Sequence, residues 1–237
     1  LALARLVEAA RAGTDPGHAR DALRAAGLLL HGTPGLCQFD DLWGEAAALL
    51  AAVLPHTEGG EAEPVALDLA LGDFRLTGRI GSVYTGGPVS FRPAKIQAKD
   101  RLRAWITHLA GHAAGHAAWR AVLVGRDGKT RIFGIPGDPA GTLETLLALY
   151  WRGLKKPLPF APESSLAWAV RFRITGDAGE AGDRAAGKWT SSSFQRGESD
   201  DLWYRTCFRR TSPLENGDFG PTALAVFEPL LSGEEAS

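Results

Sequence analysis

The period at which apolar residues recur changes near residue 63, and this change constrains the fold more than any other feature of the sequence. Over residues 1–54 the spacing is helical, and three amphipathic helices ended by Gly or Pro are predicted. Over residues 63–93 apolar residues alternate with polar ones, which predicts two or three strands with a hairpin turn at Gly86-Gly87. This order is typical of an α/β or α+β domain that follows a helical lead-in.

The rest of the chain predicts mostly helices. Residues 175–198 are small and polar and predict a mobile loop around a short helix. We therefore expect a mixed sheet flanked by helices, with a helical C-terminus. Helices are predicted over residues 95–114, 138–153, from Ser164 or Ser165 to 173, 200–210 and 219–231.

The stretch GRDGKT, residues 125–130, has two interpretations. It resembles the end of a phosphate-binding loop, but the first glycine of that motif would fall at Leu123. Asp127-Gly128 separates two strand-like runs and is typical of a hairpin turn. We expect the hairpin and propose no nucleotide site.

Composition narrows the class of protein. The 237 residues are 45% hydrophobic and 22% charged with a net charge of −1, which indicates an ordinary globular protein without a global positive field. Cys37 and Cys207 form no CxxC pair, so we expect a reducing, cytoplasmic environment. Neither a signal peptide nor a membrane span is expected. The chain has no methionine and is interpreted as part of a longer protein.

Three histidines, His108, His112 and His116, follow one another at i, i+4 and i+8. Two imidazoles at this spacing can bind zinc, although a further ligand is needed. No glutamate stands in the H-E-x-x-H position, and Gly111 and Gly115 weaken the helix. A polar helix face or helix end is therefore favoured over a metal site.

The stretch FRPAKIQAKDRLR, residues 91–103, is basic. Its single acid is Asp100. Lys95, Lys99 and Arg103 are four residues apart, which predicts that they lie on one face of a helix. Such a stripe can follow a DNA backbone by sequence-independent contacts, although an ordinary solvated face looks the same. Its basic residues are Arg92, Lys95, Lys99, Arg101 and Arg103.

The order helix, three strands, helix, strand is also that of PD-(D/E)XK nucleases. Those enzymes hold a divalent metal through an Asp that ends the second strand and an acid-x-Lys on the third. Here Gly81 stands at the first position, and Pro93-Ala94-Lys95 keeps the lysine but replaces the acid by proline. The sequence therefore predicts a degenerate PD-(D/E)XK nuclease-like core without its metal ligands.

The stretch RGESDDLWYRTCFRR, residues 196–210, could be an acid cluster for a metal or the start of a helix. Ser199 is a suitable N-cap, and Asp200 and Asp201 would stabilise the first turn. Asp201, Arg205 and Arg209 would form an ion-pair ladder. The buried side is predicted to consist of Leu202, Trp203, Cys207 and Phe208. The helix start is the favoured interpretation.

Four stretches together resemble the C-terminal region of the RecC family, the gamma subunits of exodeoxyribonuclease V. They are LTGRIGSVYTGGPVSFRPAKIQAKDRLRAWITHL, LYWRGLKKPLPFAPESSLAW, RGESDDLWYR and VFEPLL. The likeness covers most of the chain and is weakest in residues 1–50 and 175–195. It implies a helical lead-in over residues 1–56 and an inactive nuclease-like domain over 57–237.

The resemblance also implies a function. RecC-family proteins work with RecB and RecD on double- and single-stranded DNA, in unwinding and repair of double-strand breaks by homologous recombination. This domain would be non-catalytic, guiding and splitting duplex DNA and docking partner subunits. No cofactor is expected in it, because Mg²⁺ and ATP would belong to the partner subunits.

The family implies a pin that splits the duplex. On physical grounds, an aromatic residue at a hairpin tip can stack on an opened base pair, and Tyr84 beside Gly86-Gly87 is the candidate. The expected DNA-contacting residues are Tyr84, Arg92, Lys95, Lys99 and Arg103.

Two alternatives stay open. The chain could be an active metal-dependent nuclease with migrated acids, Glu45, Asp68 or Asp73. It could also be a module that contacts only protein.

Overall fold

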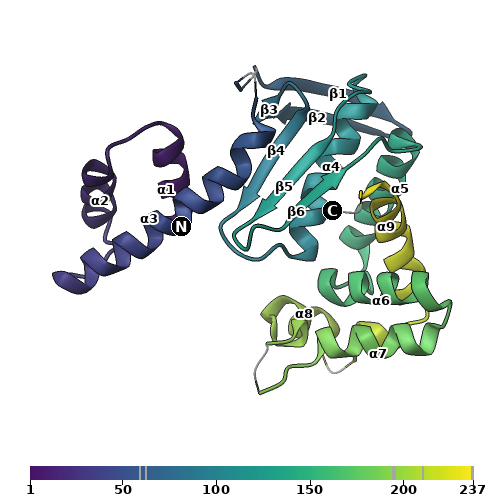
Figure 1. The fold of residues 1–237 in the computed structure, drawn as a ribbon. Coiled ribbons are helices and arrows are strands. Elements are labelled where there is room, and N and C mark those ends of the chain that lie inside the picture. The colour runs from purple at the N-terminus through teal and green to yellow at the C-terminus, as the bar shows by residue number, and fades with distance from the viewer. Residues whose placement is uncertain (59, 62, 194–195, 210, 236–237) are drawn as a thin grey trace.

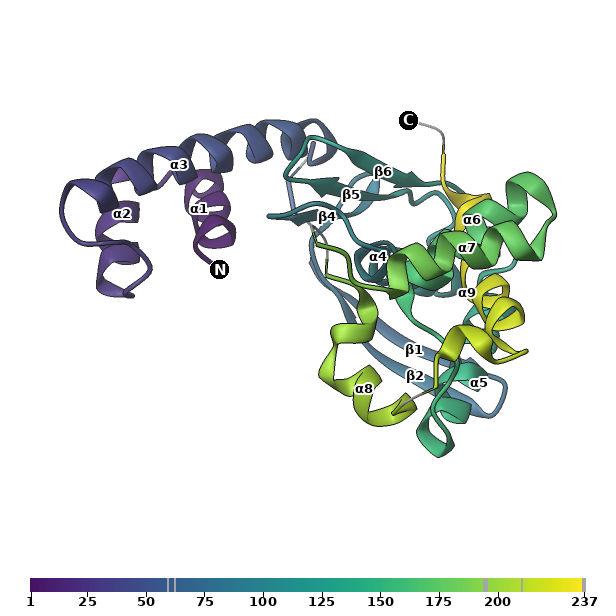
Figure 2. The ribbon, with the colours of Figure 1, turned by 90° about the horizontal axis from the view of Figure 1, so that it is seen from below.

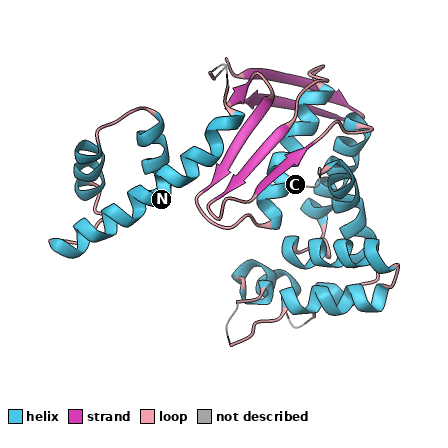
Figure 3. Cartoon of the chain, in the orientation of Figure 1, coloured by secondary structure: helices cyan, strands magenta, loops and turns pink. Residues whose placement is uncertain are grey.

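The computed structural model describes residues 1–58, 60–61, 63–193, 196–209 and 211–235 of the chain. It is a mixed α/β structure in which helices lie on both sides of a small sheet (Figure 3). The expected mixed sheet flanked by helices is confirmed at this level.

The N-terminal region consists of helices α1 (Ala2–Arg11), α2 (Pro16–Ala25) and α3 (Thr33–Val53), followed by the short 3-10 helix η1 (Leu54–His56). The three predicted helices are confirmed. Asp15 caps α2 by accepting a hydrogen bond from the His18 N–H at 3.2 Å. Helix α3 runs from the sheet outward, and α1 and α2 lie along it (Figure 1).

The N-terminal helices share a hydrophobic core with the sheet. Leu6 of α1 and Leu49 of α3 belong to the same buried cluster as Val89, Val122 and Val124. The boundary predicted at residue 56 therefore does not separate two cores, although the division into domains stays a prediction.

The strands form two sheets. Strands β1 (Val65–Leu71) and β2 (Phe74–Ile80) are an antiparallel hairpin, with Val65 opposite Ile80. Strands β3 (Val83–Tyr84), β4 (Gly87–Arg92), β5 (Ala121–Gly125) and β6 (Thr130–Phe133) form a second sheet in the order β3-β4-β5-β6. In it β4 and β5 are parallel, with Val89 opposite Val122, and the other pairs are antiparallel.

The expected three-strand meander is therefore wrong in its connectivity. The chain leaves the first sheet after Ile80 and enters the second at Val83. Ser82 between them has a φ of 51°, a left-handed conformation that ends a strand. A nuclease-like core of three consecutive strands is not confirmed.

Helix α4 (Ala98–Ala113) connects the parallel strands β4 and β5, as a parallel pair requires. Helix α4 covers one face of β4 and β5, while α5 (Pro139–Lys155) packs against α4 and β1, and both predicted helices are confirmed. Strand β5 is buried along its whole length, because Leu123 faces the α4 side and Val122 faces the N-terminal helices. Asp127-Gly128 makes the predicted hairpin turn, with Gly128 at a φ of 74°.

The C-terminal part is helical. The short helix predicted within residues 175–198 is confirmed, but it is 12 residues long and packed, since its Ala181 and Ala185 are fully buried. Phe194 and Gln195 of that segment lie outside the described residues. The elements are α6 (Pro162–Thr175), α7 (Ala178–Trp189), η2 (Glu198–Asp200), α8 (Leu202–Phe208), η3 (Pro213–Glu215) and α9 (Phe219–Gly233).

Helices α6 and α7 form a hairpin that turns at Gly176, and they lie side by side in both views (Figures 1 and 2). Helix α9 returns the chain to the sheet, where Glu234 bridges to Phe133 of β6. In the described part of the chain, every helix is too short or too polar to span a lipid bilayer.

Candidate nucleic-acid interface

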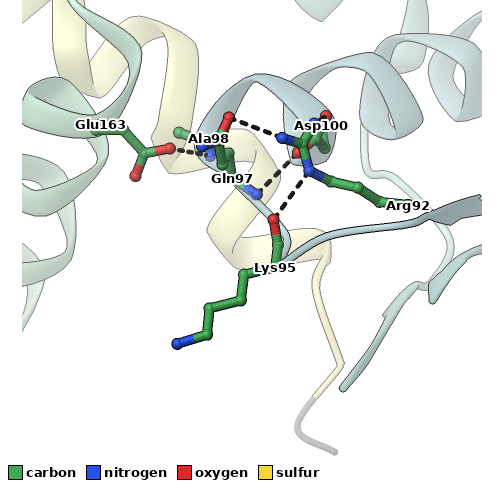
Figure 4. Close-up of polar contacts among 6 residues, drawn as sticks. All are labelled: Arg92, Lys95, Gln97, Ala98, Asp100 and Glu163. Carbon is green, nitrogen blue, oxygen red and sulfur yellow. Dashed lines mark hydrogen bonds and ion pairs between the residues drawn. The ribbon is translucent and has the colours of Figure 1, made fainter. Parts of the chain in front are cut away.

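Arg92, at the end of β4, holds together the start of α4 (Figure 4). Its guanidinium donates to Asp100 Oδ1 at 2.6 Å, to Gln97 Oε1 at 3.1 Å and to the Lys95 carbonyl at 2.9 Å. Gln97 and Asp100 form the capping box of the helix. Arg92 is therefore occupied inside the fold, and its expected role as a free phosphate contact lacks support from this geometry.

Two glutamates extend this junction into the C-terminal helices. Glu163 of α6 accepts a hydrogen bond from the Ala98 N–H at 2.6 Å and so caps α4. Glu198 in turn accepts from the Glu163 and Ser164 N–H groups at 3.0 and 2.8 Å, and from the Ser164 hydroxyl at 2.7 Å. Each carboxylate lies at the positive end of a helix, where the dipole favours it. The stretches FRPAKIQAKD, PESS and RGES are thereby linked by hydrogen bonds.

A groove of about 800 Å³ lies between the β1–β2 hairpin, strand β4 and helix α4, and we name it the β2–α4 groove. Its volume is in the range of ligand-binding clefts, roughly 300–1,000 Å³. Several residues singled out from the sequence line it together: Gly81, Tyr84, Arg92, Pro93 and Arg103.

Two arginines give this groove its available positive charge. Arg103 of α4 and Arg79 of β2 are exposed, and neither forms an ion pair with another described residue. Arg11 of α1 also lines the groove but is paired with Glu61. Arg79 was not among the residues predicted from the sequence. The signal was the alternation along β2, which places Arg79 on the same exposed face as Arg75.

Tyr84 is not an exposed residue at a hairpin tip. It is 5% exposed, pairs with Gly87 in the β3–β4 ladder, and lies beneath the Arg11 guanidinium at 5.9 Å from the ring centroid. Burial raises the pKa of its hydroxyl. The predicted exposed ring is therefore wrong, and the exposed turn consists of Thr85 and Gly86 instead.

The stripe Lys95, Lys99 and Arg103 does not form one helix face. Helix α4 begins at Ala98, so Lys95 lies before it, and its side chain extends away from the Arg92 junction (Figure 4). Lys95 and Lys99 are exposed but do not line the β2–α4 groove. Arg101, the fifth basic residue of this stretch, is buried and paired with Glu234.

The degenerate nuclease positions lie where the strands end. Gly81 follows β2, and Pro93 and Lys95 follow β4 in the loop before α4, not on a strand as expected. Both Gly81 and Pro93 line the β2–α4 groove.

The acids considered for a migrated metal site do not converge. Asp68 forms a bidentate pair with Arg75 at 2.6 and 2.7 Å, and Glu45 lies 3.5 Å from Arg126. Asp73 stands in the turn between β1 and β2, not on the first strand. Among the described residues, no group of three or more His, Cys, Asp or Glu side chains could hold a metal ion.

The three histidines serve the fold in different ways. His108 is fully buried and donates from Nε2 to the Gly134 carbonyl at 2.7 Å, and burial lowers its pKa to about 4. His112 bonds the Trp119 carbonyl at 2.9 Å, and His116 stacks on the Trp119 ring. His116 lies beyond Ala113, where α4 ends.

The stretch RGESDDLWYRTCFRR begins a helix, but the expected details are wrong. Asp201 is the N-cap of α8 and accepts from the Trp203 N–H at 2.8 Å, whereas Ser199 lies in η2. Leu202 and Trp203 are 68% and 76% exposed, and Cys207 is exposed too. Of the predicted buried side, Phe208 alone is half-buried.

The expected ion-pair ladder in that stretch is also wrong. Arg209 has a φ of 52° and ends the helix, so it cannot continue a row from Asp201 and Arg205. The ion pair of this segment is Arg196 with Asp200, at 4.0 Å. Arg210 lies outside the described residues.

Comparison with known proteins gives one consistent result. The family model "RecC C-terminal domain" matches residues 2–173. The RecBCD enzyme subunit RecC of Mycobacterium tuberculosis (strain H37Rv) is 33% identical over 237 residues, which cover 95% of this chain and 20% of that protein. The subunit of Mycolicibacterium smegmatis is 30% identical over 94% of this chain and 22% of its own length.

A more distant relative gives the same likeness. The RecBCD enzyme subunit RecC of Escherichia coli (strain K12) is 27% identical over 80% of this chain and 18% of its own length. The chain thus spans about a fifth of the length of the relatives it matches.

Proposed function

Because the chain belongs to the RecC C-terminal domain family, we propose that it is a non-catalytic domain that guides DNA within a RecBCD-type helicase and nuclease complex. Its partners would be RecB- and RecD-type subunits and the single and double strands of a DNA end. Mg²⁺ and ATP would act in those partner subunits. The relatives of the chain bear the name RecBCD enzyme subunit RecC, which supports this context.

One observation carries the proposal. The β2–α4 groove holds two exposed arginines without an ion-pair partner among the described residues, Arg79 and Arg103, beside the positions Gly81 and Pro93. Guanidinium groups are suited to phosphate. The acids that line the groove, Glu8 of α1 and the Arg92-paired Asp100 of α4, belong to no metal-binding group among the described residues, which favours binding of a strand over its cleavage. The half-buried Phe91 of the same groove offers an apolar contact for a base.

The salt dependence of DNA binding tests this proposal. The double variant Arg79→Ala, Arg103→Ala is placed in the complete complex, and affinity for a duplex end is measured over a series of salt concentrations. Two lost phosphate contacts should reduce the slope of log K against log salt by up to about 1.8. The matched control Arg24→Ala, Arg173→Ala removes two exposed charges outside the groove, which are likewise unpaired among the described residues, and should leave the slope unchanged. An unchanged slope in the groove variant would contradict the proposal.

A nuclease assay separates the enzymatic alternative. Purified chain is incubated with linear DNA and Mg²⁺ or Mn²⁺, and no cleavage is expected. Cleavage that disappears in Asp68→Ala would overturn the non-catalytic assignment in favour of a migrated site.

A further inference from the structure

A second groove, of about 470 Å³, lies between α6 and α7 on a different part of the molecule, and we name it the α6–α7 groove. Its floor consists of Leu166, Val170 and Ile174, which follow at i, i+4 and i+8 along α6. Val170 is 36% and Ile174 is 70% exposed. An aliphatic row of this spacing is the kind of surface that a neighbouring helix covers.

The rest of α6 already has its covering elements. Trp168 belongs to one buried cluster with Ala181 of α7 and Phe219 of α9, and Ala169 is fully buried in the main core. The helix is therefore apolar on two sides, and the row from Leu166 to Ile174 is the side left open.

One wall of the groove is cationic. Arg184 and Lys188 lie at i and i+4 on α7, and neither pairs with another residue of the described chain. Asp183 is the acid on the same wall, and Glu163 of α6 lies in the groove with its carboxylate held by the Ala98 N–H. The α7 wall, with two cations and one acid, is therefore positive.

The lining argues against nucleic acid as the occupant. No aromatic ring lines the α6–α7 groove in the described residues, and single strands are held mainly by stacking on aromatic side chains. An aliphatic floor beside a cationic wall instead matches a helix with Leu or Ile on one face and Asp or Glu next to it.

We propose that the α6–α7 groove docks an acidic amphipathic helix of a partner protein chain. The row from Leu166 to Ile174 covers eight residue steps, roughly 12 Å of helix at 1.5 Å per residue, which corresponds to about two turns of the docked helix. Its apolar anchors would pack on Val170 and Ile174, and its carboxylates would pair with Arg184 and Lys188. This docking is independent of DNA binding in the β2–α4 groove.

Gly187 provides a direct way to close the groove. It lies in the lining, and a Cβ added there would meet no atom within 4 Å. Gly187→Trp should therefore fill the groove. It should not weaken α7, because glycine is itself unfavourable in the interior of a helix. Gly182→Trp is the matched control. A Cβ added at Gly182 also meets no atom within 4 Å, but Gly182 does not line the groove.

The probe is a fluorescein-labelled synthetic peptide of 18 residues, with Leu at i, i+4 and i+8 and Glu at the flanking positions; a second peptide has Lys at those positions. Binding to the 237-residue chain is measured by fluorescence anisotropy. The Glu peptide should bind at least about tenfold more tightly than the Lys peptide. Gly187→Trp should abolish this binding, Gly182→Trp should retain it, and Arg184→Glu with Lys188→Glu should reverse the preference.

The contrary results are equally definite. Equal affinity for the two peptides, or binding of the Glu peptide that Gly187→Trp leaves intact, would overturn the proposal. A loss of DNA affinity in Gly187→Trp would also overturn it, because the groove would then belong to nucleic acid. Circular dichroism of both tryptophan variants verifies that α7 is still folded, so a lost signal can be assigned to the blocked groove.

Discussion

Two regions around α4 use arginine in opposite ways. At the start of the helix and on its inner face, Arg92 and Arg101 are half-buried or buried, and each is held by a carboxylate, Asp100 or Glu234. On the outer face, Arg103 is exposed and without an ion-pair partner in the described chain, as is Arg79 across the β2–α4 groove. The first region fixes the helix, and the second offers charge to a ligand.

The difference follows from helical geometry. Arg101 and Arg103 are two residues apart, which separates their side chains by about 200° around the helix. A basic stretch in a sequence therefore divides into two sets when it becomes a helix. Only the set that faces solvent can bind phosphate, and the other must find acids inside the fold.

The largest expected effect comes from the inner face. In Glu234→Ala the buried Arg101 loses its partner, and an unpaired buried charge costs about 3–5 kcal/mol of unfolding free energy. Burial already lowers the pKa of the Arg101 guanidinium, which agrees with this cost. Urea denaturation gives the free energy. Glu235→Ala, which removes the exposed pair with Arg120, is the control and should cost at most about 1 kcal/mol.

A buried neutral group in α4 gives the next effect, and it depends on pH. Because the pKa of His108 is about 4 in the folded chain and about 6.5 when unfolded, only the unfolded state gains a proton between these values. His108 therefore favours folding fully above pH 6.5, and about 3 kcal/mol of unfolding free energy is lost as pH falls to 4. His108→Gln should lose much of this pH dependence. If its dependence matched that of the unchanged chain, His108 would not be buried in the neutral form.

How much of this arrangement could be predicted depends on which interactions are local. The helices of residues 1–54 and the Asp127-Gly128 hairpin follow from spacing and turn chemistry within a few residues, and they were predicted correctly. The split into two sheets was missed, because it depends on the left-handed conformation of Ser82. The short helix within residues 175–198 was predicted, but its burial was not, because Ala181 and Ala185 are buried only by packing against α6 and α9.

The candidate site shows the same limit. Arg103 was expected on the solvated face of the helix predicted over residues 95–114, and it is exposed. The partner Asp100 of Arg92 could be anticipated, because it is eight residues away in the sequence. The caps Glu163 on α4 and Glu198 on α6 could not, because they come from distant parts of the chain. The burial of Tyr84 depends on packing with Leu6 and Val7 of α1 and beneath Arg11, which no local pattern indicates.

A smaller effect concerns the link between the inner region and the C-terminal helices. Glu198→Ala removes three hydrogen bonds that cap α6, and we expect a loss of about 1–3 kcal/mol, the range for a cap whose acceptor is charged. Hydrogen exchange should show faster exchange of the Glu163 and Ser164 amides. Ser199→Ala changes a neighbour without these bonds and should leave both readouts unaltered.

The variants Arg92→Ala and Arg103→Ala have the smallest expected effects on stability. Together they give the sharpest test of the difference between the paired and the unpaired arginines. Arg92→Ala removes three hydrogen bonds at the start of α4 and should lower the unfolding free energy by about 1–2 kcal/mol. Arg103→Ala should change it by less than about 0.5 kcal/mol, because the side chain is exposed and unpaired among the described residues. At a temperature where both variants are folded, the order should reverse for DNA: Arg103→Ala should reduce the salt slope of binding by up to about 0.9, and Arg92→Ala should leave it unchanged. If the two variants had equal effects on stability and equal effects on the salt slope, the paired Arg92 and the unpaired Arg103 would not have distinct roles.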